Sequence, residues 1–97
     1  MRKHQAKAIG ELLSDFFADN EPLREKLQVM RVQRAWGELL GSSIMQYTSG
    51  IYVRNRVFYV SLTSSVLRNE LILSRERLIK SLNDHVGAQV IDNIVIR

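Results

Sequence analysis

The chain has 97 residues, of which 45% are hydrophobic and 25% charged, and it contains no cysteine. This length suits one domain and the composition is that of a globular protein, while the lack of cysteine excludes disulfides, thiol catalysis and thiolate metal sites. Fourteen Lys and Arg against ten Asp and Glu give a net charge of +4. Such a surplus favours phosphate or another acidic surface as a partner, the alternative being a solvated face that keeps the domain soluble.

Localisation signals are missing from the sequence. No stretch approaches the roughly 18 consecutive apolar residues of a membrane span, and no signal-peptide core follows the basic start at residues 1–4. We therefore expect a cytoplasmic protein with no membrane partner. Residues 1–97 are expected to form a single domain, with residues 1–4 as a flexible N-terminus.

Two amphipathic helices are predicted at the start of the chain. The first spans residues 5–19, where apolar residues recur at steps of three and four: Ile9, Leu12, Leu13, Phe16 and Phe17. Pro22 suits the first turn of a second helix, which is expected to run to Leu40. Gly41 then stands where a left-handed helix terminator is expected, and residues 42–49 are predicted to be a connector.

A β-hairpin is predicted next. Residues 51–53 and 57–60 are rich in β-branched and aromatic side chains and flank Arg54-Asn55-Arg56, in which Asn55 is best suited to a positive φ. Alternation places two sets of side chains on opposite faces of the second strand. One face carries Phe58, Val60 and Leu62, and the other carries Val57, Tyr59 and Ser61.

A third helix and a last strand complete the chain. Ser64 and Ser65 provide an N-cap for a helix over residues 65–85, with a buried stripe of Leu67, Leu71, Leu78 and Leu82. Gly87 is expected to end it, and a strand over residues 90–96 follows with Ile94 and Ile96 facing inward. Ile72 and Leu73 are predicted to be core residues, with exposure at a protein contact as the alternative.

The predicted order is therefore α-α-β-β-α-β. A hairpin followed by a strand that returns through a helix gives a three-stranded mixed sheet with helices packed on one side. The helical crossover allows the last strand to lie parallel to one hairpin strand. The fold class is α+β.

Three blocks of this sequence resemble the DciA-like bacterial domain family. The blocks are Trp36-x-x-Leu39-Leu40-Gly41, Val57-Phe58-x-Val60-x-Leu62, and the run from Ser64 to Leu71. The resemblance extends from about Ile9 to Ile96 and is to compact, tail-less members such as those of the Bacteroidetes. It implies a KH-like domain that binds DNA and associates with the replicative helicase during helicase loading.

The sequence departs from related patterns in two places. A KH domain holds four nucleotides with a GxxG loop, and none is present, because Gly37 and Gly41 are separated by three residues. Any nucleic-acid contact must then use another surface. Many helicase-loading members continue into a basic tail, whereas this sequence stops at Arg97. The resemblance therefore implies the fold more directly than it implies helicase loading.

Five residues are the candidate nucleic-acid contacts. Arg54 and Arg56 at the hairpin tip suit neighbouring phosphates, and Arg68 and Arg75, seven residues apart on the predicted helix, form a second basic group. Tyr59 is the candidate for stacking on an unpaired base. The alternative for the arginines is ordinary solvent exposure, since turns and helix surfaces tolerate them.

Catalysis finds no support in the sequence. His4 and His85 are the two histidines, and neither has a partner at a spacing typical of a metal site or a catalytic pair. Phosphate-binding glycine loops and nucleophile elbows are also missing. We expect a non-enzymatic protein without metal, cofactor or small-molecule substrate.

Two functions are consistent with these features. The first is a DNA-binding module of the replication machinery, with single- and double-stranded DNA both open and RNA not distinguished. The second is a protein-interaction adaptor that docks on the replicative helicase or another acidic partner with little direct nucleic-acid contact. The apolar run Leu71-Ile72-Leu73 motivates the second function.

Overall fold

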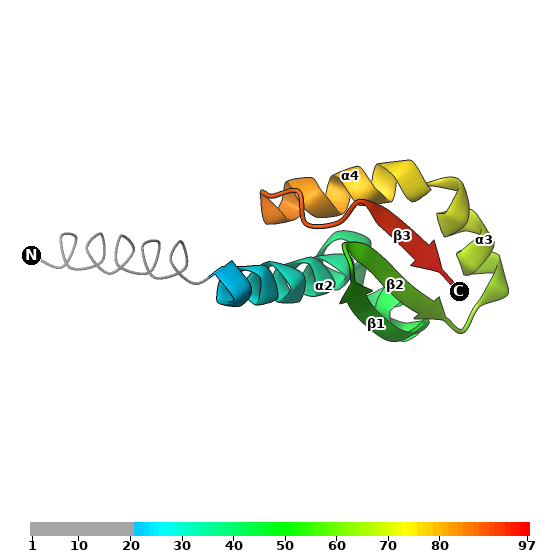
Figure 1. Ribbon diagram of the computed structural model, residues 1–97. Coiled ribbons are helices and arrows are strands. Elements are labelled where there is room, and N and C mark those ends of the chain that lie inside the picture. The colour runs from blue at the N-terminus through cyan, green and yellow to red at the C-terminus, as the bar shows by residue number, and fades with distance from the viewer. Residues whose placement is uncertain (1–20) are drawn as a thin grey trace, which may run out of the picture.

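The computed structural model describes residues 21–97, so the helix predicted for residues 5–19 and the N-terminus at residues 1–4 lie outside the described residues. The elements along the chain are α2 (Glu21–Gln46), β1 (Thr48–Arg54), β2 (Val57–Leu62), α3 (Ser65–Leu73), α4 (Arg75–Val86) and β3 (Asn93–Ile96) (Figure 1). The predicted α+β class is confirmed.

The three strands form one mixed sheet in the order β1-β2-β3. β1 and β2 pair antiparallel, and β3 lies parallel to β2, as predicted from the helical crossover. Asn55 and Arg56 form the hairpin turn with φ of 52° and 63°, so the positive φ expected at Asn55 is confirmed and Arg56 shares it. Two positive φ values are typical of a type I′ turn, whose twist matches that of the strands.

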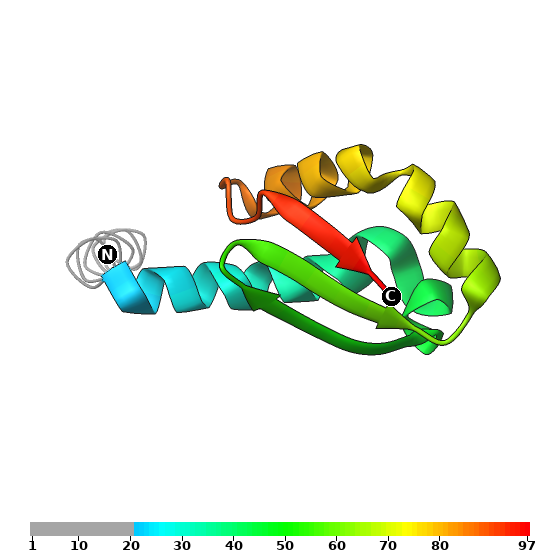
Figure 2. The same ribbon diagram turned by 45° about the vertical axis from the view of Figure 1, so that its right-hand side comes forward.

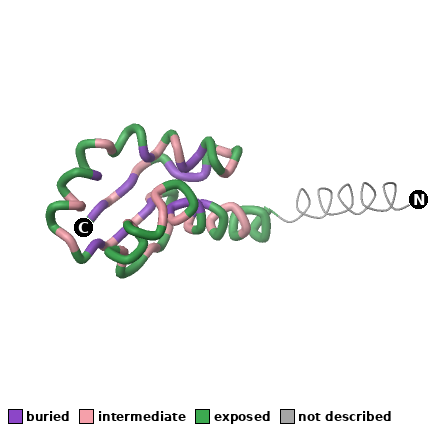
Figure 3. The backbone as a smooth tube through the Cα atoms, turned by 180° about the vertical axis from the view of Figure 1, so that it is seen from behind, coloured by how far each residue is buried: buried purple, intermediate pink, exposed green. Residues whose placement is uncertain are grey.

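The helices pack on one face of the sheet. Phe58, Val60 and Leu62 on β2, with Ile94 and Ile96 on β3, are buried as predicted. Figure 2 shows the strands in front of α2, and Figure 3 shows buried segments along β2, β3, α2 and α4. The fully buried Trp36 of α2 meets Phe58 at 5.6 Å between ring centroids. The core therefore lies between the sheet and the helical layer.

The region after Gly41 differs from its prediction. Gly41 has the expected positive φ (φ 87°, ψ 173°) and kinks the chain, but a further helical turn follows, and β1 begins at Thr48. The connector predicted for residues 42–49 is therefore wrong. Trp36 Nε1 donates to Thr48 Oγ1 at 3.1 Å, and this hydroxyl donates to the carbonyl of Ile44 at 2.9 Å. These bonds hold the extra turn against the core.

The predicted third helix is two helices, broken at Ser74 (φ −106°, ψ 17°). The N–H of Ser74 donates to the carbonyl of Leu71 at 3.0 Å, and its own carbonyl accepts from the N–H of Leu78 at 2.9 Å. Ser74 thus ends α3 and begins α4. The spacing of Leu71 and Leu78 matches one continuous stripe, and for this reason a single helix was predicted.

Both ends of this helical region agree with their predictions. The Ser64 side chain accepts from the N–H of Leu67 at 3.2 Å, so the N-cap is confirmed. Gly87 adopts the left-handed conformation, with φ 82° and ψ 21°, and ends α4.

The last strand begins at Asn93 instead of Val90. Val90 and Ile91 are buried, yet their backbone groups bond to the side chain of Asn83, which is 5% exposed. Asn83 Oδ1 accepts from the N–H of Val90 at 2.9 Å and of Ile91 at 3.0 Å, and Nδ2 donates to the carbonyl of Ile91 at 2.9 Å. Backbone groups held by a side chain do not join the sheet, so the strand starts later.

Ile72 and Leu73 contradict their predicted core position. Leu73 is 85% exposed and Ile72 is 41% exposed. Because α3 ends at Leu73 and the chain changes direction at Ser74, only Leu71 of the apolar run enters the core.

Candidate nucleic-acid interface

The open sheet face is the face turned away from α2 and α4. It consists of alternate residues of the three strands, and the strand register arranges them in three rows across the sheet. All of them are half-buried or exposed, whereas the intervening residues of β2 and β3 form the core. The rows are Arg54, Val57 and Asn93; Tyr52, Tyr59 and Val95; and Gly50 and Ser61, which Arg97 extends just beyond β3 through backbone bonds to Val60 and Leu62.

A stacked tyrosine pair occupies the middle row. Tyr52 and Tyr59 lie directly opposite each other on β1 and β2, with ring centroids 4.6 Å apart and planes 10° from parallel. Arg97 reaches over them, with its Cζ 5.6 Å from the Tyr52 centroid and 5.3 Å from that of Tyr59. Its Nη2 donates to the Tyr52 hydroxyl at 2.7 Å. Aromatic rings and a guanidinium on a flat sheet provide both π-surface and positive charge.

Tyr59 is the predicted residue of this group, and Tyr52 and Arg97 were missed. Tyr59 is half-buried, while Tyr52 is 44% exposed. A signal for Tyr52 exists in the sequence: a two-residue turn at Asn55-Arg56 places Tyr52 opposite Tyr59. No comparable signal exists for Arg97, which reaches the pair only because β3 lies beside β2.

Two of the predicted arginines border the open sheet face. Arg54 is exposed in the row nearest the hairpin turn. Arg75, at the start of α4, donates from its Nη2 to the side-chain oxygen of Asn93, at the other end of that row. Arg54, Arg75 and Tyr59 are therefore on or beside one surface.

Arg68 does not line up with Arg75. The break at Ser74 places Arg68 on α3 and Arg75 on α4, so the alignment expected from their seven-residue spacing on one helix is wrong. Arg68 is half-buried. No single helix therefore presents both arginines to a row of neighbouring phosphates.

Arg56 points away from Arg54 and toward the loop before β3. Its Nε donates to Asp92 Oδ2 at 2.7 Å, and its Nη2 donates to Asp92 Oδ1 at 2.9 Å and to the carbonyl of Gln89 at 2.8 Å. These hydrogen bonds raise the pKa of Arg56 and lower that of Asp92. The guanidinium therefore joins the hairpin turn to the loop and is already bonded to a carboxylate.

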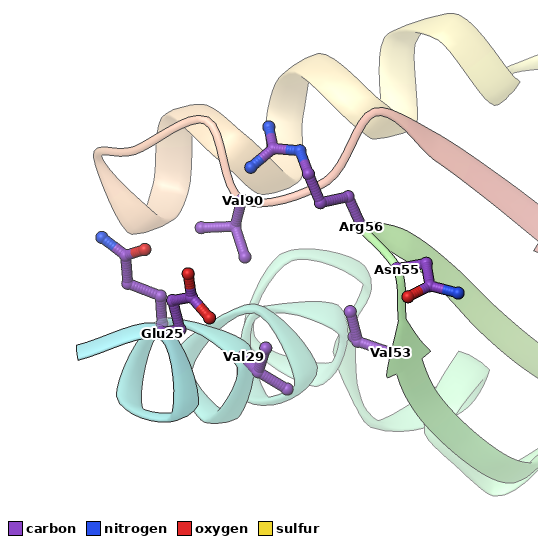
Figure 4. Close-up of a pocket in the computed structure, with 7 residues that line it drawn as sticks. Glu25, Val29, Val53, Asn55, Arg56 and Val90 are labelled. Carbon is purple, nitrogen blue, oxygen red and sulfur yellow. The ribbon is translucent and has the colours of Figure 1, made fainter. Parts of the chain in front are cut away.

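A hollow of about 290 Å³ lies under Arg56, between α2, the hairpin and the loop before β3 (Figure 4). Val29, Val53 and Val90 form its apolar lining, and the carboxylate of Glu25 stands on its α2 side. Gln28 and Asn55 add amide groups to the lining, and the guanidinium of Arg56 is already bonded to Asp92, so the full charge left at the hollow is that of the Glu25 carboxylate. This chemistry does not suit a phosphate.

Among residues 21–97, no group of three or more His, Asp or Glu is placed to hold a metal ion. In the same range, no helix is both long and apolar enough to cross a membrane. His85, the one histidine in this range, pairs through Nε2 with Glu38 Oε2 at 3.2 Å and so joins α4 to α2.

The family model described as "Dna[CI] antecedent, DciA" matches residues 8–96. The chain belongs to the DciA family. This family is associated with loading of the replicative helicase, and the resemblance inferred from the three sequence blocks is confirmed. Neither the curated proteins nor the solved structures gave a match. The KH-like character of the DciA fold stays a prediction.

The three family blocks have structural roles in this chain. Trp36 fills the core and Gly41 makes the kink that follows it. Phe58, Val60 and Leu62 of the second block form the inward face of β2, and the third block begins with the Ser64 cap and ends with the buried Leu71. The residues of these three blocks therefore contribute mainly to the fold, while the tyrosine pair lies on the other face of the same sheet.

Proposed function

We propose that this DciA domain is a non-enzymatic DNA-binding module that acts in replicative-helicase loading and holds single-stranded DNA on its open sheet face. The observation that carries the proposal is the Tyr52–Tyr59 stack beneath the guanidinium of Arg97. Bases of a single strand stack on aromatic side chains, and a cationic rim attracts the backbone.

The preference for a single strand follows from the shape of this surface. The bases of a duplex are already stacked on one another and present only their edges, so they cannot lie on a tyrosine ring without unpairing. Unpaired bases are free to do so. In this proposal Arg97 stacks on a base or meets its phosphate, and Arg54 and Arg75 contact phosphates at the row near the hairpin turn.

The binding test compares two tyrosine variants by fluorescence anisotropy with labelled single-stranded and duplex DNA across salt. Stacking contributes about 1–3 kcal/mol per base. We therefore expect Tyr52→Ala with Tyr59→Ala to weaken single-strand binding at least about fivefold. Tyr47→Ala removes an exposed tyrosine that precedes β1 and lies outside the open sheet face, so it should bind like the wild type.

Fluorescence of the buried Trp36 reports whether each variant is folded. If the folded double tyrosine variant binds single-stranded DNA as tightly as Tyr47→Ala does, the open sheet face is not the binding surface. If the wild type binds duplex more tightly than a single strand, base stacking does not drive the interaction.

A second function is favoured by the exposed apolar residues of α3. Val66 is 73% exposed and Leu73 is 85% exposed, and residues seven apart lie on the same side of a helix. Exposed apolar surface of this kind marks contacts with other proteins. Because the DciA family is associated with the replicative helicase, we propose that α3 docks on that helicase as an adaptor.

The docking test uses Val66→Ser with Leu73→Ser in pull-downs of purified replicative helicase from the same species. Since both side chains are exposed, the variant should fold normally and bind DNA as the wild type does, but recover much less helicase. Recovery equal to that of the wild type would rule out α3 as the docking surface and leave the DNA proposal intact.

A further inference from the structure

The seam between α2 and α4 contains a second basic site. A hollow of about 250 Å³ opens there, lined by Arg31, Arg34 and Glu38 of α2 and by His85 and Val86 of α4. Arg31 and Arg34 are exposed, and residues three apart on a helix are neighbours on its surface. Two guanidiniums therefore border one small hollow.

The single carboxylate at this hollow already has a partner. Glu38 Oε2 lies 3.2 Å from His85 Nε2, in a pair that joins the two helices. Within residues 21–97, neither Arg31 nor Arg34 has a salt bridge or a side-chain hydrogen bond. Their planar donor groups are thus available to an incoming anion, and the guanidinium fork fits phosphate oxygens two at a time.

The seam and the open sheet face lie on different sides of the domain. Every residue that lines the hollow belongs to α2 or α4, and none belongs to the sheet. These helices cover the face of the sheet that carries Phe58 and Ile94, so the core separates the hollow from Tyr52 and Tyr59. A segment of DNA that stacks on the tyrosines would therefore not contact the seam.

From this arrangement we infer that the α2/α4 seam binds the phosphodiester backbone of a second nucleic-acid segment, so that one domain holds two segments at once. Arg31 and Arg34 supply the contacts to phosphate, and the Glu38–His85 pair keeps the two helices in register beside them. The seam contacts are to the backbone alone and are therefore independent of base sequence. This inference adds a second site to the proposed function and uses none of the residues of the first.

The test is a two-strand capture. A single-stranded oligonucleotide is fixed to beads and saturated with the domain, unbound protein is washed away, and a labelled second oligonucleotide is added. We expect the wild type to capture the second strand, while Arg31→Ala with Arg34→Ala binds the beads but loses capture. Lys26→Ala with Arg77→Ala removes the same charge from exposed positions outside the hollow and should retain capture.

A salt titration gives an independent reading of the same site. In a Tyr52→Ala and Tyr59→Ala background, stacking is lost and the seam should account for a larger share of the remaining binding. Loss of two phosphate contacts to a single strand lowers the slope of log affinity against log salt by about 1.4. Arg31→Ala with Arg34→Ala should produce that change in this background, and Lys26→Ala with Arg77→Ala should not.

The outcomes separate the two sites. Capture by the Arg31/Arg34 variant at the wild-type level, or no capture by the wild type, would overturn the inference even if the tyrosine variant confirms the open sheet face. Loss of capture in the arginine variant, together with unchanged binding by the tyrosine variant, would support the seam and refute the proposed stacking surface. Displacement of the second strand by inorganic phosphate at equal ionic strength would show that the seam recognises the free ion and would overturn a strand-binding role.

Discussion

Asn83 is the buried polar side chain that holds the loop before β3. Replacing it with alanine removes three hydrogen bonds and leaves the buried N–H of Ile91 without its partner, while the N–H of Val90 keeps the carbonyl of Ala88 at 3.0 Å. The carbonyl of Ile91 keeps one donor, Gln89 Nε2 at 3.4 Å. At about 1 kcal/mol for each hydrogen bond lost, the three bonds should lower the free energy of unfolding by about 3 kcal/mol.

The measurement is urea unfolding followed by fluorescence of Trp36, the single and fully buried tryptophan. For an m-value of about 1.5 kcal/mol/M, a loss of about 3 kcal/mol moves the midpoint down by about 2 M urea. The matched control is Asp84→Ala, one position along α4. Asp84 is exposed and, within residues 21–97, pairs only with Lys80 at 3.0 Å, an i,i+4 contact that contributes about 0.3–0.5 kcal/mol.

If Asn83→Ala and Asp84→Ala shift the midpoint by the same amount, the argument from buried hydrogen bonds fails. If the difference appears as expected, single-strand binding by Asn83→Ala should also weaken under conditions where the variant is still folded. The reason is that the loop held by Asn83 leads directly into β3, which positions Arg97 over the tyrosine pair.

Two further predictions follow from the hairpin loop contact and from the kink in α2. Because hydrogen bonds from Arg56 lower the pKa of Asp92 below its ordinary value of 3.8, the pair stabilises the fold fully above that value and loses its effect as pH falls through the lowered pKa. The difference in Tm between the wild type and Asp92→Asn should therefore be present at neutral pH and close as the pH falls through the lowered pKa of Asp92. A difference that stays constant with pH would contradict this. Gly41→Ala should lower the free energy of unfolding by about 1–3 kcal/mol through backbone strain alone, since φ is 87° and no atom lies within 4 Å of the added Cβ. Gly50→Ala, which is equally open and has no left-handed φ, should be near neutral, and equal losses in urea unfolding would refute the strain argument.

Local sequence patterns predicted much of the sheet. Alternation identified the inward face of β2, and the positive φ expected at Asn55 placed the hairpin turn correctly. These predictions succeeded because strand alternation and turn geometry depend on residues within a few positions of one another. Tyr59 was placed on the outward face for the same reason.

Helix boundaries were less predictable than strand faces. A leucine every seven residues is compatible both with one long helix and with two helices that each bury their own leucine against a different part of the core. Ser74 separates the two cases here, because its backbone closes α3 and opens α4. As a consequence Leu73 is exposed, although its sequence neighbours suggested the core.

The sequence by itself determined the α+β class, the family, the inward face of the sheet and one tyrosine of the candidate site. Only the tertiary structure decided that Arg97 would lie over Tyr52 and Tyr59, that Arg56 would be bonded to Asp92, and that Arg31 would share a hollow with His85. Periodicity records which side of an element is buried, because burial repeats with the geometry of the strand or helix. It carries no information on which distant element lies alongside, and each of these contacts joins residues more than 30 positions apart.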